Sequence, residues 1–364
     1  MAAPGRTAGW HRLPVARVER LGDDAVAVTL DVPEPLAGTF AHRAGQHVTV
    51  RHRPDGREIR RSYSVCPPPG EPGSLRLVVK RLGAGGFAEY ATTRLARGDV
   101  LELAPPTGDF RLAEQPGAHH VLIAGGSGIT PLLSMAAAAL RDDPTSRVSL
   151  LYASRASGSV LLADELADLK DAHLERFHVL HLLSREAREA ELLSGRIDAG
   201  RLPKLLALLG ADTSVGARED RCFYVCGPRG LVEAVRQGLA AAGAEPARVR
   251  FELFSTGGED WEPPARDHPA RPGGRVTARL AGRTSTATME PGDRVVLEAV
   301  LRARPETPYS CRDGLCGTCR AKVTAGVLTM DRQYALGAAE LAAGYTLACR
   351  ARPETDEVGL DFDA

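Results

Sequence analysis

The sequence predicts a multidomain protein with an antiparallel β-barrel first, a doubly wound α/β domain second and a small α+β domain last. Three observations lead to this prediction. Short strands with alternating apolar and polar residues recur through the first hundred residues. Apolar strands then alternate with helical segments. A hairpin, a helix and a cysteine-rich loop follow near the end of the chain.

The domain boundaries follow from changes in composition along the chain. We expect the barrel over 10–112, the α/β domain over 117–255 and the last domain over 273–364. Between them, 256–272 is rich in Gly, Pro and charge and is interpreted as a linker. A chain of 364 residues is long enough for two or three domains.

Composition and charge limit the possible functions. The 46 basic and 46 acidic residues give a formal net charge of zero, so we expect no nucleic-acid partner. The sequence contains no apolar run of about eighteen residues, so we expect no contact with a membrane. The first residues lack the apolar stretch of a secretory signal. Only seven cysteines occur in a long chain, which suits a reducing compartment, and we predict a cytoplasmic location.

Six short strands separated by Pro and Gly turns predict the barrel. They are expected at His11–Val18, Ala25–Asp31, His47–His52, Ile59–Val65, Ser74–Lys80 and Asp99–Ala104, with one helical segment at Gly86–Leu95. Arg61 and Tyr63 alternate on one strand and share a face, which offers a cation for a phosphate and a flat ring for stacking. The glycine-rich loop after Lys80 could cradle a pyrophosphate with its N–H groups. The alternatives are an ordinary strand and a flexible hairpin loop.

The α/β domain begins with an apolar strand, His119–Ala124, followed by Gly125-Gly-Ser-Gly128 and a helix that Pro131 opens. Strand, glycine loop and helix form the phosphate-binding geometry of a dinucleotide fold. Further strands are expected at Val148–Ala153, Phe177–Leu183 and Arg221–Val225, with helices at Leu132–Leu140, Leu161–Ala172, Pro203–Leu209 and Gly230–Ala242. Such alternation predicts a doubly wound domain.

Two segments lie where strands of that domain would end. Ser154-Arg155 ends the second strand, where Arg155 could pair with a 2′-phosphate; the alternative is a solvated arginine. Cys226-Gly-Pro228 ends the fourth strand and would face the ligand crevice, although a lone Cys226 is more often a small core residue. Cys222 and Cys66 are interpreted as core residues.

The last domain carries the cysteine motif. Cys311, Cys316 and Cys319 have C-x4-C-x2-C spacing, and Cys349 follows about thirty residues later, which is the ligand spacing of a plant-type [2Fe–2S] centre. A zinc site is the main alternative, but zinc ribbons favour two matched cysteine pairs. The surrounding elements are expected to be a hairpin, a helix and closing strands, at Arg275–Leu280, Thr284–Met289, Val295–Ala303, Ala321–Thr324 and Val358–Phe362.

Taken together, these motifs resemble the ferredoxin–NADP⁺ reductase superfamily fused to a C-terminal plant-type ferredoxin, whose fold is a β-grasp. The resemblance implies FAD, NADPH (with NADH possible) and a [2Fe–2S] cluster as cofactors. It implies Tyr63 against the isoalloxazine, Ser64 near the reactive edge of the flavin and Cys226 beside the nicotinamide, and we predict catalytic roles for these three. The cofactor-binding residues predicted on this basis are Arg61, Tyr63, Ser64, Val79, Lys80, Gly85, Gly86, Phe87, Gly126, Gly128, Thr130, Ser154, Arg155, Cys226, Gly227, Pro228 and Phe254.

The order of the three domains is similar to that of reductases of multicomponent oxygenases. The stretches 330–336 and 344–349 are more similar to the reductase component of ring-1,2-phenylacetyl-CoA epoxidase than to the alternative, the reductase of steroid 9α-hydroxylase and related Rieske oxygenases. The resemblance implies that electrons pass from NAD(P)H through FAD and the cluster to a partner oxygenase. A distant alternative is a non-catalytic iron–sulfur and flavin protein. We expect Arg312, Arg320 and 330–336 to form the docking face for the partner.

Overall fold

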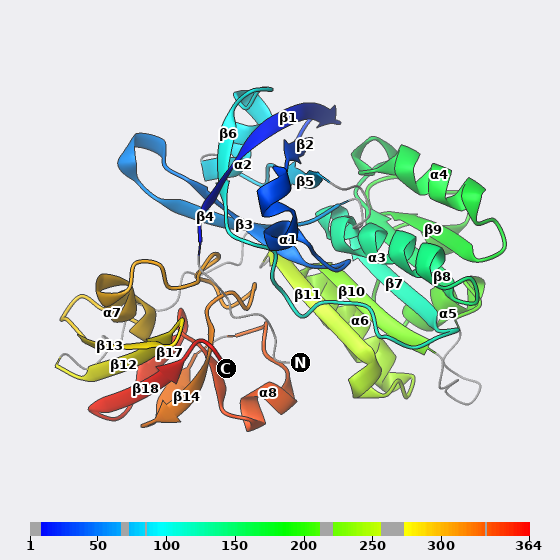
Figure 1. The fold of residues 1–364 in the computed structure, drawn as a ribbon. Helices are drawn as coiled ribbons and strands as arrows, with labels where there is room; N and C mark the ends of the chain where they lie inside the picture. Colours follow the sequence, from blue (N-terminus) through cyan, green and yellow to red (C-terminus); the bar gives the residue numbers. More distant parts are fainter. Residues whose placement is uncertain (1–8, 67–72, 84–85, 212–220, 256–272, 332) are drawn as a thin grey trace.

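Three units surround a common junction in the computed structural model, which describes residues 9–66, 73–83, 86–211, 221–255, 273–331 and 333–364 (Figure 1). The expected linker at 256–272 and the predicted cofactor residue Gly85 lie outside the described residues. Within the described ranges, no helix is both long and apolar enough to cross a membrane.

The first unit is a six-stranded sheet in the order β4-β3-β6-β1-β2-β5, with every pairing antiparallel. Its strands are β1 (His11–Leu21), β2 (Ala25–Asp31), β3 (His47–His52), β4 (Ile59–Ser64), β5 (Ser74–Lys80) and β6 (Val100–Leu103), with helices α1 (Ala37–Phe40) and α2 (Gly86–Thr93). The two edge strands meet because Val65 bridges Leu77 and the Cys66 N–H donates to the Arg76 carbonyl at 2.8 Å. The predicted barrel is therefore closed.

Alternation along these strands decides what fills the barrel. On β2, Val26, Val28 and Leu30 point into one apolar core, and Phe87 of α2 joins them with 1% of its surface exposed. The other face of β2 carries Ala25 and Ala27, which pack in a second apolar core shared with helix α3 (Ile129–Asp142) of the next domain. An apolar interface of this kind attaches the barrel firmly to its neighbour.

The second unit is a parallel five-stranded sheet in the order β11-β10-β7-β8-β9. Its strands are β7 (His119–Gly125), β8 (Arg147–Ser154), β9 (Phe177–Leu183), β10 (Arg221–Pro228) and β11 (Val249–Ser255), with helices α3 (Ile129–Asp142), α4 (Ala163–Ala172), α5 (Leu202–Leu208) and α6 (Arg229–Ala241). Residues of α3 and α4 pack on one face of the sheet and residues of α5 and α6 on the other. The strand order reverses between β7 and β10, which makes the domain doubly wound, as predicted.

The third unit is a mixed sheet in the order β13-β12-β18-β14-β16, in which β12 and β18 run parallel. Its elements are β12 (Arg275–Leu280), β13 (Arg283–Thr288), α7 (Val296–Ala303), β14 (Arg320–Ala325), β15 (Leu328–Met330), α8 (Ala338–Ala342), β16 (Tyr345–Leu347), β17 (Ala351–Pro353) and β18 (Glu357–Asp361). Helix α7 packs its apolar side, including Val296 and Val300, onto this sheet. A hairpin, a helix and a mixed sheet form the expected β-grasp.

Several elements lie beyond what the sequence predicts. The strands β15, β16 and β17 are three residues long, too short for alternation to be recognised. The strand β11 does alternate, but no strand is predicted there; the α/β domain is expected to end at 255, and Phe254 is predicted as a cofactor-binding residue. This segment is in fact an edge strand paired with β10, with Glu252 opposite Cys226.

The buried histidine His120 on β7 predicts acid sensitivity of the α/β domain. Burial lowers its pKa to about 4, with a smaller contribution from Arg250 and an opposing effect of Asp143. The unfolded chain binds this proton already near pH 6.5, so the free energy of unfolding falls as the pH drops from about 6.5 to about 4, by about 3 kcal/mol. Urea unfolding across this pH range should show a shallower decline for His120→Phe than for the wild type. Equal slopes would contradict this account.

Candidate functional site at the junction of the three domains

Strand β4 carries the predicted flavin residues. The Tyr63 ring lies 5.6 Å from the Phe87 ring, centroid to centroid, and burial raises the pKa of the Tyr63 hydroxyl above its usual range. Ser64 is 3% exposed, and its hydroxyl has no hydrogen-bond partner among the described residues. Arg61 is exposed, and its Nη1 donates to the Arg60 carbonyl at 2.8 Å. A buried hydroxyl without a partner fits a site that a polar ligand edge completes.

The segment from β5 to α2 can contribute mainly its backbone to a cofactor. The side chains of Val79 and Phe87 are buried in the barrel core, 0% and 1% exposed. The Lys80 ammonium lies 3.4 Å from the Asp24 carboxylate, so this cation already has a partner within the barrel. Gly86 opens α2 with a φ of 75°, a conformation that favours glycine. The first N–H groups of a helix have no partner within it and can bind an anion.

The glycine loop after β7 lies directly against the end of β10. A Cβ atom on Gly128 would lie 2.2 Å from the Cys226 carbonyl oxygen, so only glycine allows the two segments to touch. Thr130 fixes the loop by donating from Oγ1 to the Ser127 carbonyl at 3.0 Å. The Gly126–Thr130 segment and the Cys226–Pro228 segment, far apart in sequence, therefore form one crevice at the point where the strand order reverses.

Ser154 and Arg155 follow β8 at the same edge of the sheet. Ser154 is 6% exposed, whereas the Arg155 side chain is open to solvent. Their carbonyl groups accept hydrogen bonds from the Ser184 and Arg185 N–H groups at 2.9 and 2.7 Å, which holds this turn against the end of β9. An exposed cation at the carboxyl edge fits a 2′-phosphate, and its role there stays a prediction.

Glu252 lies where the three domains meet, and the sequence pattern assigns it no role. It stands opposite Cys226 in the sheet, and its Oε1 lies 3.7 Å from Nδ1 of His47 in the barrel. Burial raises the pKa of Glu252 to about 8, and the charge of nearby Cys316 in the third domain adds to the increase. The signal that could have revealed it is a single carboxyl group between the apolar residues Phe251 and Leu253 of this strand.

Cys226 and Phe254 occupy the same neighbourhood. Cys226 is 0% exposed, and burial, followed by the charge of Glu252, raises the pKa of its thiol well above the usual range. Its side chain packs in the apolar core shared by α3 and the barrel, as a neutral thiol and not a thiolate nucleophile. Phe254 packs against the apolar core shared by α3 and the barrel. Both predicted roles beside a bound cofactor remain predictions.

The four predicted cluster ligands lie as two pairs. A hydrogen bond to Cys316 raises the pKa of Cys311 well above its usual range, and the same hydrogen bond lowers that of Cys316 to about 6. A hydrogen bond to Cys319 likewise raises the pKa of Cys349. In the described part of the chain, no three Cys, His, Asp or Glu side chains gather as they would around one metal ion. Two cysteine pairs fit a binuclear cluster, in which each iron takes two protein ligands.

Backbone N–H groups surround these sulfur atoms. The N–H groups of Asp313 and Leu315 both donate to the Cys311 sulfur at 3.4 Å, and the Gly314 backbone donates toward Cys349. Gly314 has a φ of 73°, a conformation that favours glycine and turns the loop around the sulfur atoms. N–H groups that donate to a thiolate sulfur stabilise its negative charge. They also shift the reduction potential of an iron–sulfur cluster bound by that sulfur. The residues present therefore fit a [2Fe–2S] centre.

The loop that carries these cysteines faces the other two domains. Leu315 is 8% exposed and belongs to the apolar core that α5 and α6 form. The Tyr334 hydroxyl lies 3.4 Å from Arg229 of α6, and Arg320 lies 3.6 Å from Asp109 of the first domain. Arg320 and Tyr334 therefore contact other domains of the same chain, and the docking face expected at Arg312, Arg320 and 330–336 stays a prediction. Arg312 remains exposed.

Replacement of one cluster cysteine should abolish the activity that depends on the cluster and spare the activity that depends only on the flavin. We expect Cys316→Ser to lose the cluster absorbance and NADPH-driven reduction of cytochrome c, while reduction of ferricyanide through the flavin site continues. The buried Cys222, which lies 3.9 Å from a Gln115 oxygen, is a matched control because its replacement by serine touches no cluster ligand. Ferricyanide activity that disappears together with cytochrome c activity, in a variant that retains FAD, would contradict this division.

Comparison with known proteins agrees with the division into three sites. Residues 12–112 match an oxidoreductase FAD-binding domain, 122–237 an oxidoreductase NAD-binding domain and 278–354 a 2Fe-2S iron-sulfur cluster binding domain. The chain is 37% identical to a component of the 1,2-phenylacetyl-CoA epoxidase of Escherichia coli (strain K12), covering 98% of each chain. It is 30% identical to the ferredoxin reductase component of 3-ketosteroid-9-alpha-monooxygenase from Rhodococcus rhodochrous, covering 96% of each.

Solved structures show the same arrangement of domains. Phthalate dioxygenase reductase matches with a TM-score of 0.61 and 25% identity, covering 97% of this chain and 98% of that one. Full-length CYP116B46 from Tepidiphilus thermophilus matches with a TM-score of 0.67 and 27% identity over 99% of this chain, which spans only 43% of that longer chain. The chain is therefore an oxidoreductase that belongs to the ferredoxin–NADP⁺ reductase superfamily, among the members that end in a plant-type [2Fe–2S] ferredoxin domain.

Proposed function

We propose that this protein passes electrons from NADPH, with NADH as a weaker donor, to the oxygenase component of a phenylacetyl-CoA epoxidase. The nucleotide would bind in the crevice between β7 and β10, FAD against β4, and the cluster among the four cysteines. When bound, FAD supplies the conversion from a two-electron donor to one-electron steps, and the [2Fe–2S] centre supplies a one-electron carrier. The protein holds the cofactors at fixed positions and tunes their reduction potentials.

One observation supports this route more than any other. Glu252 pairs with Cys226 in the sheet, its Oε1 lies 3.7 Å from His47 of the barrel, and the charge of Cys316 in the third domain adds to the rise of its pKa. The three predicted sites therefore converge on a single buried carboxyl group. Such convergence is what a chain of electron carriers requires, and an assembly of unrelated binding modules would not need it.

Four residues of the proposed route are buried, while Cys311 and Cys316 are half-buried. Cys226, Ser64, Cys319 and Cys349 are all no more than 4% exposed. A dry path protects reduced carriers from solvent and lets fixed N–H dipoles act on them at full strength. Two buried oxygens, Ser64 Oγ and Glu252 Oε2, lack hydrogen-bond partners among the described residues. A bound flavin would supply these partners.

The choice of oxygenase rests on sequence similarity. The chain is 37% identical to the epoxidase component and 30% identical to the steroid monooxygenase component, each over nearly its full length. A Rieske-type oxygenase such as steroid 9α-hydroxylase is therefore the second candidate. Both candidates use the same internal route and differ only in the protein that receives the electrons.

Reconstitution with purified oxygenases tests the proposed partner. With NADPH as donor, the holo-protein should drive product formation by the phenylacetyl-CoA epoxidase oxygenase at a rate that saturates with reductase concentration. The same preparation should support little turnover of a Rieske steroid hydroxylase. Efficient coupling to the Rieske enzyme alone would reassign the partner and leave the internal route untouched.

Replacement of Arg155 tests the nucleotide preference. We expect Arg155→Ala to raise KM for NADPH by about 10- to 100-fold, because a charge-assisted contact to the 2′-phosphate contributes about 1.5–3 kcal/mol. KM for NADH should be nearly unchanged. Arg147→Ala is the matched control, since Arg147 is an exposed arginine at the opposite end of the same strand. Equal effects on both nucleotides would argue against a 2′-phosphate contact.

A further inference from the structure

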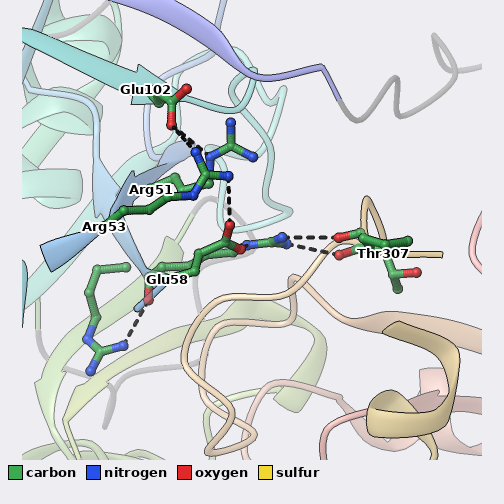
Figure 2. A network of polar contacts seen from close by, with 8 residues as sticks. Arg51, Arg53, Glu58, Glu102 and Thr307 are labelled. Carbon is green, nitrogen blue, oxygen red and sulfur yellow. Dashed lines mark hydrogen bonds and ion pairs between the residues drawn. The ribbon is translucent and has the colours of Figure 1, made fainter. Parts of the chain in front are cut away.

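A buried arginine connects the first domain with the third. Arg60 lies on β4, and its side chain is 4% exposed. Around it, charged side chains of the barrel form the network in Figure 2, in which Arg51 binds Glu102 and Arg53 binds both Glu102 and Glu58. Thr307 of the third domain lies beside this network. Burial of a charged side chain in such an interface requires partners for its donors.

The guanidinium of Arg60 has partners on both sides of the interface. Its Nε donates to Glu58 Oε1 at 2.7 Å within the barrel domain. Its Nη1 and Nη2 donate to the carbonyl oxygens of Thr307 and Pro305 at 3.1 and 3.2 Å in the third domain. The fixed fork of an arginine can bind a carboxylate on one edge and two carbonyls on the other, which the single ammonium of lysine cannot do.

Aromatic rings complete the environment of Arg60. Its guanidinium carbon lies 4.0 Å from the ring centre of Tyr309 in the third domain and 4.9 Å from that of Trp10, which precedes β1. A delocalised, weakly hydrated cation is attracted to the faces of such rings, most strongly where water is excluded. Tyr309 is itself only 8% exposed. The contact is therefore built from both domains and not from exposed side chains that meet by chance.

The position of Arg60 connects the flavin strand to the cluster loop. Because side chains alternate on a strand, Arg60 and Ser64 lie on the same face of β4, roughly 13 Å apart along it. On the other side of the interface, Tyr309 precedes the ligand Cys311 by two residues. A displacement of the third domain at Arg60 would therefore move the cysteine loop relative to the flavin strand.

We propose that Arg60 is a positioning residue for electron transfer from the flavin to the cluster, and that it acts by fixing the ferredoxin domain on β4. The superfamily motif assigns a role to the neighbouring Arg61 and none to Arg60. The inference rests on the internal flavin-to-cluster step of the proposed function and is independent of the oxygenase partner. It predicts that loss of Arg60 slows this step while the nucleotide and flavin sites remain intact.

The test compares two electron acceptors in the holo-protein. We expect Arg60→Met to retain NADPH–ferricyanide activity and cluster absorbance, but to reduce cytochrome c about tenfold more slowly or worse, since misplacement of reacting groups by about 1 Å can cost two orders of magnitude. Arg60→Lys should be intermediate. Arg53→Met is the matched control, because Arg53 binds Glu58 and Glu102 and its contacts stay within the barrel domain.

A second measurement does not depend on bound cofactors. Small-angle X-ray scattering should show a larger radius of gyration for Arg60→Met than for the wild type and Arg53→Met, in apo- and holo-protein alike. Equal scattering together with unchanged cytochrome c reduction would overturn the proposal. A parallel fall of both activities would also overturn it, because that result indicates a general structural role. Wild-type protein that fails to reduce cytochrome c would instead refute the proposed function.

If Arg60→Met does not fold or does not retain FAD, the comparison moves to Arg60→Lys, which keeps the buried positive charge. The lysine variant should still show slower cytochrome c reduction at unchanged ferricyanide activity, because one ammonium cannot replace the bidentate contact with the Pro305 and Thr307 carbonyls. Wild-type behaviour of Arg60→Lys in both assays and in scattering would then reject the role of the bidentate contact.

Discussion

Electron transfer through protein weakens steeply with distance, so carriers that work in sequence must be held close together. The whole arrangement of this chain follows from that constraint. Glu252 lies near the carboxyl end of the parallel sheet, it lies 3.7 Å from His47 of the barrel, and its pKa is raised in part by Cys316 of the β-grasp domain. Each domain has an apolar core, one further core joins the barrel to α3, and Leu315 of the third domain packs in the core of α5 and α6.

The junction is held by interactions of two kinds. Apolar contacts attach the barrel to helix α3 and bring Leu315 of the cysteine loop into the core beside α5 and α6. These contacts favour association but allow sliding, because the hydrophobic effect has no direction. Arg60 makes directional contacts with carbonyl groups across the interface and with rings on both sides of it. These contacts fix the position of the ferredoxin domain on the barrel. Buried polar contacts give specificity in this way even where they add little stability.

The sequence predicts what depends on local pattern and fails where the structure depends on contacts between distant segments. Alternation and turn residues locate most strands of the barrel within a few residues, and the spacing of Cys311, Cys316 and Cys319 identifies the cluster loop. No local pattern can show that Arg60 contacts Thr307, which lies 247 residues later. For the same reason, the sequence cannot show that Arg320 lies 3.6 Å from Asp109 of the first domain.

The central claim is that the three sites work as one intramolecular route, and rapid mixing tests it directly. The holo-protein is mixed anaerobically with NADPH at several protein concentrations, and the absorbance of flavin and cluster is followed over time. Convergence of the sites predicts that the cluster is reduced with a rate constant that does not depend on protein concentration. A rate that rises in proportion to protein concentration would show that electrons pass between molecules, and it would contradict the account.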